Sequence, residues 1–307
     1  MRHRHPTELP PMTLPSLKQL RYLVHLYEHR NFSRAAEACN VTQAALSSSI
    51  QELESLLRLH LVERTRRMVA FTAIGEQVVE KARELLRAAQ DLGNIGQAAG
   101  PLTGVLRLGI IPTIGPYLLP RLLPGVADRC PLLDLHVREE FSASLCTALG
   151  RGDLDCAILA LPYPCATLDY AALFDDPLVL AFHREDPVGA QMALAEEDWV
   201  ERLLLLPDGH CLRDHTLSLC GRADLNRQAM SASTLQTLVH LVDNRRGVTL
   251  LPEMAVRAGI LNGLHVATRP LPDPEAKRHI VLAWRGGAAM ATTYQRLAQV
   301  IQELRQQ

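Results

Sequence analysis

A glycine-rich break near residue 100 most constrains what this 307-residue chain can fold into. It contains Gly93, Gly96, Gly100 and Pro101. Before the break, apolar residues recur at spacings of three and four, which predicts amphipathic helices. After it, short apolar runs alternate with helical stretches, which predicts α/β architecture. We therefore expect a helical N-terminal part and a separate α/β part, in line with the two or three domains typical of this length.

Residues 16–72 have the pattern of two short helices joined by a tight turn. Asn31 can cap one helix, which Asn40 ends, and Thr42 can cap the next. This pattern predicts a helix-turn-helix, with a corner of a plain helical bundle as the alternative. Residues 61–72 then form two short extended runs around a basic turn, as in a wing that touches DNA phosphates.

Candidate DNA contacts divide by position. Residues 1–72 hold ten Lys/Arg against six Asp/Glu, a net charge of +4, which leaves −5 for the remainder. Base contacts are expected on the exposed face of the second short helix, at Gln43, Ala44, Ser47, Ser48 and Gln51. For the serines, solvated helix surface is the alternative. Phosphate or minor-groove contacts are expected in the basic turn, at Arg64, Arg66 and Arg67.

Residues 73–95 predict a long helix with a dimerisation seam. Apolar residues alternate spacings of four and three, as in a short coiled coil. They are Val78, Ala82, Leu85, Ala89 and Leu92. The chain is therefore expected to be at least a homodimer. Residues 96–103, which follow the helix in the sequence, are expected to form a hinge.

The ends, composition and cysteines exclude several classes of protein. Residues 1–15 contain four prolines and are expected to form a disordered lead. No run of 18 apolar residues and no apolar secretory stretch occur, so we expect no membrane span and no export. Seven cysteines fit neither a secreted disulfide framework nor zinc spacing, which predicts no metal and a cytoplasmic protein whose disulfides would be transient. No nucleotide-binding motif follows a predicted strand, so no cofactor is expected.

Residues 104–307 are expected to alternate strands and helices. The predicted strands are residues 105–110, 135–138, 155–160, 178–182, 203–206, 248–251 and 280–284. The predicted helices are residues 115–126, 142–149, 233–244 and 292–305.

The order of these parts resembles the LysR-type transcriptional regulators. Residues 32–51 carry that family's run of small residues followed by Thr-Gln and Leu-Ser, and residues 61–65 and 71–75 also fit. The resemblance covers residues 16–305. It implies a winged helix-turn-helix, a long dimerisation helix and a two-lobed α/β regulatory domain of periplasmic-binding-protein type. It also implies double-stranded DNA and RNA polymerase as partners, and a homotetramer built as a dimer of dimers.

Two blocks resemble the hydrogen-peroxide-sensing members of that family. They are residues 109–120 and residues 208–214, the second followed by Cys220. The resemblance implies a peroxidatic Cys211 that is resolved by Cys220, activation of antioxidant genes, and reduction by a thioredoxin or glutaredoxin system. It also implies a peroxide pocket lined or supported by Thr113, Ser142, His210, Arg213, Asp214 and Arg285. These relatives usually have threonine where this chain has Ser142.

The residues around Cys211 suit that chemistry. A thiol reacts as the thiolate, which a cation or a helix N-terminus favours. Arg213 is the expected cation, and the Asp208-Gly209 turn would place Cys211 in the first turn of a helix. If residues 212–219 are helical, the Cα atoms of the two cysteines lie about 13.5 Å apart. A disulfide needs roughly 4.4–6.8 Å, so oxidation must unwind that helix.

The remaining cysteines are expected to be inert small apolar residues: Cys39, Cys130, Cys146, Cys156 and Cys165.

Three alternatives stay open. A regulator of this family could instead respond to a small organic ligand between its two lobes, with Cys211 and Cys220 as core residues. A thiol peroxidase fused to a DNA-binding head would need repeated turnover with a reductant. A solute-binding protein would share the α/β architecture, but the helix-turn-helix and the lack of a signal peptide argue against it.

Overall fold

The computed structural model describes residues 14–64, 69–94, 102–165, 167–190, 199–220 and 232–306. The chain divides into two compact units, residues 1–93 and 94–307. Most of the predicted lead (1–15) and of the predicted hinge (96–103) lies outside the described residues. Both therefore stay predictions.

The first unit is a winged helix-turn-helix followed by a long helix. Its elements are α1 (Leu17–His29), α2 (Phe32–Ala38), α3 (Gln43–Leu57), β1 (Val62–Arg64), β2 (Val69–Phe71) and α4 (Ala73–Asn94). β1 and β2 pair antiparallel, as expected of a wing.

Local capping explains where the short helices begin. The Asn31 side chain accepts a hydrogen bond from the backbone N–H of Arg34, and the Thr42 hydroxyl accepts one from that of Ala45, which confirms both predicted caps. α2 ends at Ala38, slightly before Asn40, which adopts a left-handed φ of 54°.

The long helix α4 buries only part of the predicted seam inside its own unit. Val79 and Ala82 are buried in the helix-turn-helix core. Leu85 and Leu92 are 55% and 71% exposed. The prediction of one seam through Ala82 is therefore wrong, because Ala82 faces the chain's own core. Leu85 and Leu92, seven residues apart, form the outward stripe, whereas Val78 is half-buried against the helix-turn-helix core.

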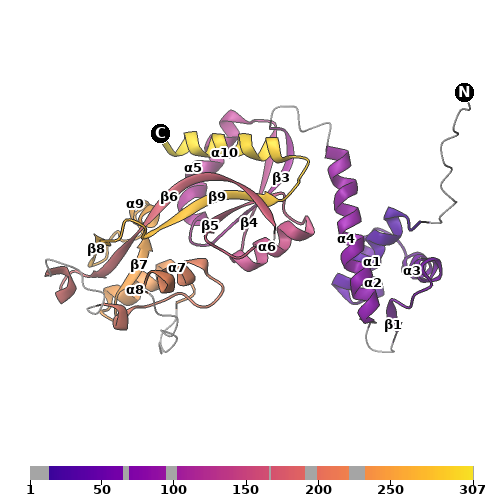
Figure 1. Cartoon of the computed structure of the whole chain (residues 1–307), viewed down its shortest axis with the longest axis horizontal. Coiled ribbons are helices and arrows are strands. Elements are labelled where there is room, and N and C mark those ends of the chain that lie inside the picture. The colour runs from indigo at the N-terminus through magenta and orange to yellow at the C-terminus, as the bar shows by residue number, and fades with distance from the viewer. Residues whose placement is uncertain are drawn as a thin grey trace, which may run out of the picture. The chain divides into compact units, whose positions relative to one another are not determined.

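The second unit is an α/β domain with one long strand shared by two lobes (Figure 1). Its elements are β3 (Gly104–Ile110), α5 (Gly115–Arg129), β4 (Leu133–Glu139), α6 (Ser142–Arg151), β5 (Cys156–Leu161), β6 (Leu168–His183), η1 (Pro187–Ala190), η3 (Val200–Arg202), α7 (Cys211–Leu219), α8 (Leu235–Asp243), β7 (Thr249–Pro252), α9 (Glu253–Arg257), β8 (Val266–Pro270), β9 (Lys277–Arg285) and α10 (Ala291–Gln306).

The strand order β4-β3-β5-β9-β6-β7, with β8 also paired to β6, defines the two lobes. Residues 168–177 of β6 pair with β9 in the first lobe. Residues 178–183 pair with β7 and β8 in the second. Each lobe has its own apolar core, so the predicted two-lobed α/β fold is confirmed.

Two details of the predicted strand pattern are wrong. Residues 203–206 form only an isolated bridge, between Leu203 and Val248. The first half of β6 and all of β8 were not predicted, because polar residues such as Asp169 and Arg269 interrupt their apolar pattern.

No helix in the described ranges is long and apolar enough to cross a membrane.

Candidate functional site

Cys211 is the first residue of α7, as predicted. Gly209 has a φ of +97°, a conformation that favours glycine, and His210 is the N-cap. Residues 212–219 contain no glycine or proline and continue the helix to Leu219. Cys211 is 2% exposed, so the thiol lies in the first-lobe core rather than on the surface.

The surroundings of Cys211 act on its thiol in opposite directions. Burial is the largest effect and raises the pKa of Cys211. The Arg278 guanidinium, the Ser142 hydroxyl and the backbone N–H of Leu212 lower that pKa, whereas Asp214 raises it. The resting group is therefore a buried thiol with three thiolate-stabilising groups around it.

Arg278 is the main functional residue that the sequence reasoning missed. It is fully buried and donates from Nη1 to Thr113 Oγ1 at 2.8 Å and from Nη2 to Asp176 Oδ2 at 2.6 Å. The backbone N–H of Met254 donates to the other oxygen of Asp176 at 3.0 Å. The network thus joins β9, β6, α9 and the turn after β3.

Two predicted arginines have other positions. Arg285 lies at the far end of β9, opposite Leu168, so the arginine that contacts Thr113 is Arg278. Arg213 pairs through Nε with Asp208 at 2.9 Å and donates to the carbonyl of Leu206. The prediction that Arg213 supplies the charge near the thiol is therefore wrong, and Arg278 supplies it.

Two buried polar atoms beside Cys211 have unmet hydrogen-bonding capacity. Ser142 Oγ and His210 Nε2 lack a hydrogen-bond partner of normal geometry within the described part of the chain. The His210 ring packs edge-on against Phe141, with centroids 4.6 Å apart. Burial lowers the pKa of His210, so its ring is neutral at neutral pH. Both atoms therefore keep hydrogen-bonding capacity beside the thiol.

Cys220 lies at the opposite end of α7. Its backbone N–H donates to the carbonyl of Thr216 at 3.2 Å, which continues the helical pattern up to that residue. Cys220 is buried in a second-lobe cluster, whereas Cys211 belongs to the first-lobe core. Both are thiols in this structure, and they lie nine positions apart along the helix, which places their Cα atoms about 13.5 Å apart.

The other five cysteines fall into two groups. Cys39, Cys130 and Cys156 are thiols whose pKa is raised by burial, in agreement with inert apolar residues. Cys146 and Cys165 are joined as a disulfide, with Cα atoms 5.6 Å apart. The prediction that these two are inert is therefore wrong.

The predicted base-contact residues lie on the surface of α3. Gln43, Ala44, Ser48 and Gln51 are exposed and Ser47 is half-buried. Leu46, Ile50 and Leu53 fix the opposite face in the core.

Side-chain contacts steady part of this face. Ser33 Oγ of α2 donates to Gln43 Oε1 at 3.2 Å, which joins the two helices of the motif. Of the predicted phosphate contacts, Arg66 and Arg67, and the side chain of Arg64, lie outside the described residues.

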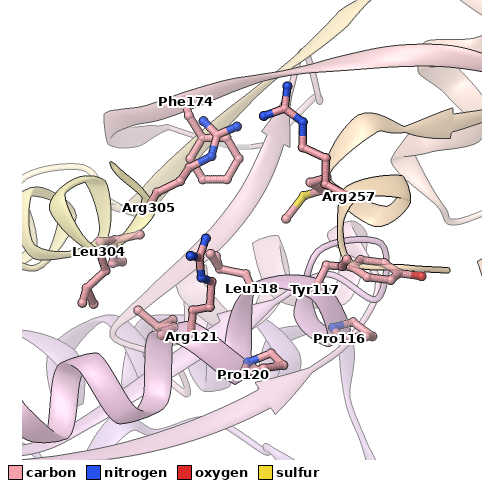
Figure 2. Close-up of a pocket in the computed structure, with 13 residues that line it drawn as sticks. Pro116, Tyr117, Leu118, Pro120, Arg121, Phe174, Arg257, Leu304 and Arg305 are labelled. Carbon is pink, nitrogen blue, oxygen red and sulfur yellow. The ribbon is translucent and has the colours of Figure 1, made fainter. Parts of the chain in front are cut away.

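A separate cavity of about 540 Å³ lies between α5, β6, α9 and α10. Figure 2 shows Arg121, Arg257 and Arg305 among the side chains that line the cavity, together with apolar residues such as Phe174. The Arg305 guanidinium stacks 3.7 Å from the centroid of the Phe174 ring, and Arg257 pairs with Glu253 on its own helix. Cys211, Ser142, His210 and Arg278 do not line the cavity, although Met254, which contacts Arg278, does.

No group of three or more His, Cys, Asp or Glu that could hold a metal ion occurs among the residues that the structure describes.

The fold and site define a two-domain bacterial transcription regulator. Residues 17–76 match the family model "Bacterial regulatory helix-turn-helix protein, lysR family", and residues 99–306 match "LysR substrate binding domain". The chain belongs to the LysR family of DNA-binding transcription regulators, which are not enzymes. The fused-peroxidase and solute-binding alternatives are therefore wrong.

Within the family, the chain is similar to peroxide-responsive members. It is 39% identical to the hydrogen peroxide-inducible genes activator of Dickeya chrysanthemi over 94% of this chain and 95% of the relative. It superposes on a full-length OxyR variant from Pseudomonas aeruginosa with a TM-score of 0.74 at 33% identity, covering 94% and 98% of the two chains. It is also 44% identical to the regulator EstR of Acinetobacter baylyi over 81% and 83% of the two chains.

Proposed function

We propose that this chain is a hydrogen-peroxide-sensing LysR-type regulator that activates antioxidant genes. The observation that carries the proposal is the site of Cys211: a buried thiol at a helix N-terminus, beside the buried Arg278 and two polar atoms with unmet hydrogen bonds. The similarity to hydrogen peroxide-inducible genes activators supports it.

The first step forms one sulfur–oxygen bond. The Cys211 thiolate attacks one peroxide oxygen and the O–O bond breaks. The leaving hydroxide takes a proton and departs as water, leaving Cys211 as sulfenic acid. Arg278 and Ser142 favour the thiolate. His210 and Ser142 can donate to the departing oxygen, and Thr113, held by Arg278, can orient the peroxide.

The second step forms the disulfide. The Cys220 thiolate attacks the sulfenic sulfur and a second water leaves. A disulfide needs Cα atoms within roughly 4.4–6.8 Å, so α7 must unwind. On the chain-entropy estimate, closing so short a loop stabilises the folded chain relative to the unfolded chain by about 2–3 kcal/mol. The unwinding of α7 makes it a two-state element, and its change of shape links the redox state of the two cysteines to oligomer assembly and DNA binding.

The DNA-binding unit completes the regulator. The exposed face of α3 reads bases, and the basic turn that contains Arg66 contacts phosphates. The outward stripe of Leu85 and Leu92 pairs with the same stripe of a second chain. A homotetramer, RNA polymerase and a thioredoxin or glutaredoxin reductant complete the proposed partners, and the protein acts in the cytoplasm.

Two cysteine variants of the full-length protein test the proposal. Cys220→Ser should stop at a sulfenic acid that a dimedone probe labels at Cys211, with no change in DNA footprint. Cys211→Ser should show no footprint change with peroxide. The matched control is Cys130→Ser, which removes a buried thiol distant in sequence from α7. A full peroxide response from Cys211→Ser would contradict the proposal.

A second candidate function is a response to a small organic anion. The cavity flanked by Arg121, Arg257 and Arg305 favours it, although two of these guanidinium groups are already engaged. Aromatic and aliphatic carboxylates should then raise the melting temperature of the protein with concentration, and Arg121→Ala should abolish that rise. If no carboxylate changes the melting temperature of the protein, this second candidate function is wrong.

A further inference from the structure

Cys146 and Cys165 join two elements that are separate in the fold. Cys146 lies in α6, and Cys165 lies in the loop between β5 and β6. Their Cα atoms are 5.6 Å apart, in the middle of the range that disulfides occupy. Both residues are half-buried, whereas Cys156 is completely buried. The linked pair is therefore open to small thiols and oxidants.

Both linked elements are walls of the Cys211 site. Ser142, whose hydroxyl acts on the Cys211 thiol, begins α6, and Cys146 follows one turn later on the same side of the helix. On the other wall, the carbonyl of Pro162 accepts a hydrogen bond at 2.8 Å from Nε2 of His215, a buried residue of α7.

Tyr163, beside Pro162, also faces the first turn of α7. Burial raises the pKa of Tyr163, and the negative charges of Asp214 and Cys211 raise it further. The bond to Cys165 thus anchors a loop that contacts α7 near both Cys211 and His215.

We propose that Cys146 and Cys165 form a second, reversible thiol–disulfide centre, which sets the reactivity of Cys211 by holding α6 against the 162–165 loop. The link itself rests on the geometry of the two cysteines. Its effect on Cys211 rests on the function proposed above.

The chemistry balances with a hydroperoxide as oxidant. One thiolate attacks the O–O bond and becomes a sulfenic acid as water, or an alcohol from an organic hydroperoxide, departs. The second thiolate attacks that sulfur and releases water, which leaves one S–S bond in place of two S–H bonds. A dithiol reductant reverses the process by exchange through a mixed disulfide.

The link should favour the first oxidation at Cys211. With the bond closed, Ser142 stays beside the Cys211 thiol, and the carbonyl of Pro162 that accepts from His215 stays in place. With the bond open, α6 and the loop can part, and the Ser142 hydroxyl no longer supports the thiolate as well. Sulfenic acid should then form more slowly at neutral pH, and the pH midpoint of its rate of formation should rise.

The first experiment tests the link alone in the full-length Cys211→Ser variant. Thiols are alkylated before and after dithiothreitol, and peptides are mapped by mass spectrometry. We expect a peptide pair linked through Cys146 and Cys165 that dithiothreitol opens and one equivalent of hydrogen peroxide restores. If both cysteines stay fully alkylated after peroxide, the proposal is wrong. Because Cys211 is absent, this outcome does not depend on the proposed sensor.

The second experiment tests the effect on Cys211 in a Cys220→Ser background, where the reaction stops at sulfenic acid. We expect Cys146→Ser, Cys165→Ser and the double variant to slow dimedone labelling of Cys211 equally, by about threefold to tenfold. A tenfold loss is what a pKa rise of about one causes. The pH midpoint of the rate should rise as well. Cys39→Ser, in the other unit, is the matched control and should change neither quantity.

The outcomes separate the two proposals. Equal rates and equal pH midpoints with and without the link would overturn the role of the second centre while leaving the Cys211 sensor intact. Failure of Cys211 to react in every background, with the link still forming, would overturn the sensor and the coupling but leave the link in place.

Discussion

The buried ion pair of Asp176 and Arg278 allows stability and reactivity to be separated by mutation. Their side chains are 1% and 0% exposed, and the two atoms that pair lie 2.6 Å apart. Removing one partner leaves the other as an uncompensated buried charge, which costs about 3–5 kcal/mol. Arg278→Met and Asp176→Leu should each lower the free energy of unfolding by that amount.

The double variant should not show the sum of the two losses. An apolar pair of similar volume often replaces a buried ion pair at little cost. The hydroxyl of Thr113 and the backbone N–H of Met254 lose their partners, at about 1–3 kcal/mol each. The double variant should therefore lose about 2–6 kcal/mol, which is less than the sum of the two single losses.

Reactivity should follow a different pattern from stability. Arg278 is the charge that most lowers the pKa of Cys211. Both variants that lack it should form sulfenic acid about tenfold more slowly at neutral pH, which corresponds to a pKa change of about one. Asp176→Leu keeps the guanidinium and should retain the rate while it is folded.

Urea unfolding followed by tryptophan fluorescence measures the stability of the correct unit. The chain has two tryptophans, Trp199 and Trp284, and both are buried in the regulatory unit. Dimedone labelling in the Cys220→Ser background measures the rate. The reasoning is refuted if the stability losses simply add in the double variant, or if that variant regains the wild-type rate together with its stability.

Three further predictions concern the thiol, the dimer and the wing. Because burial raises the pKa of Cys211, its sulfenic-acid rate in Cys220→Ser should increase steadily from pH 7 to 9, and stopped-flow rates that stay flat would contradict this. Leu85→Glu should yield monomers in sedimentation, since it places a charge in the outward stripe of α4, whereas Glu84→Gln on the adjacent exposed position should leave the dimer intact. Arg66→Ala should weaken binding to all DNA sequences and reduce the slope of log affinity against log salt by about one, and a footprint with unchanged affinity and slope would remove the wing from the proposal.

Local signals predicted the start of each short helix, because a cap depends on residues only three positions apart. Asn31 and Thr42 show this. Arg278 could not be found in the same way, since its partner Asp176 is 102 residues away and the sheet brings them together. A weak signal was present: each is a charged residue within a strand that the core covers.

Periodicity and composition left two other questions undecided. The 3–4 spacing of α4 identified apolar positions but could not tell that Ala82 faces its own core while Leu85 faces outward. Composition likewise treats scattered cysteines as core residues. Cys146 and Cys165 are 19 residues apart, and only the packing of α6 beside the loop after β5 places them within bonding distance.

The position of α7 between cores explains how a single disulfide could reorganise the whole domain. Cys211 packs in the first-lobe core, Leu212 in the second-lobe core, and Cys220 in a further second-lobe cluster. Full burial of one leucine contributes about 1.5–3 kcal/mol. The proposed oxidation must displace side chains from these cores as α7 unwinds, so changes in the packing around α7 should shift the balance between the reduced and oxidised forms.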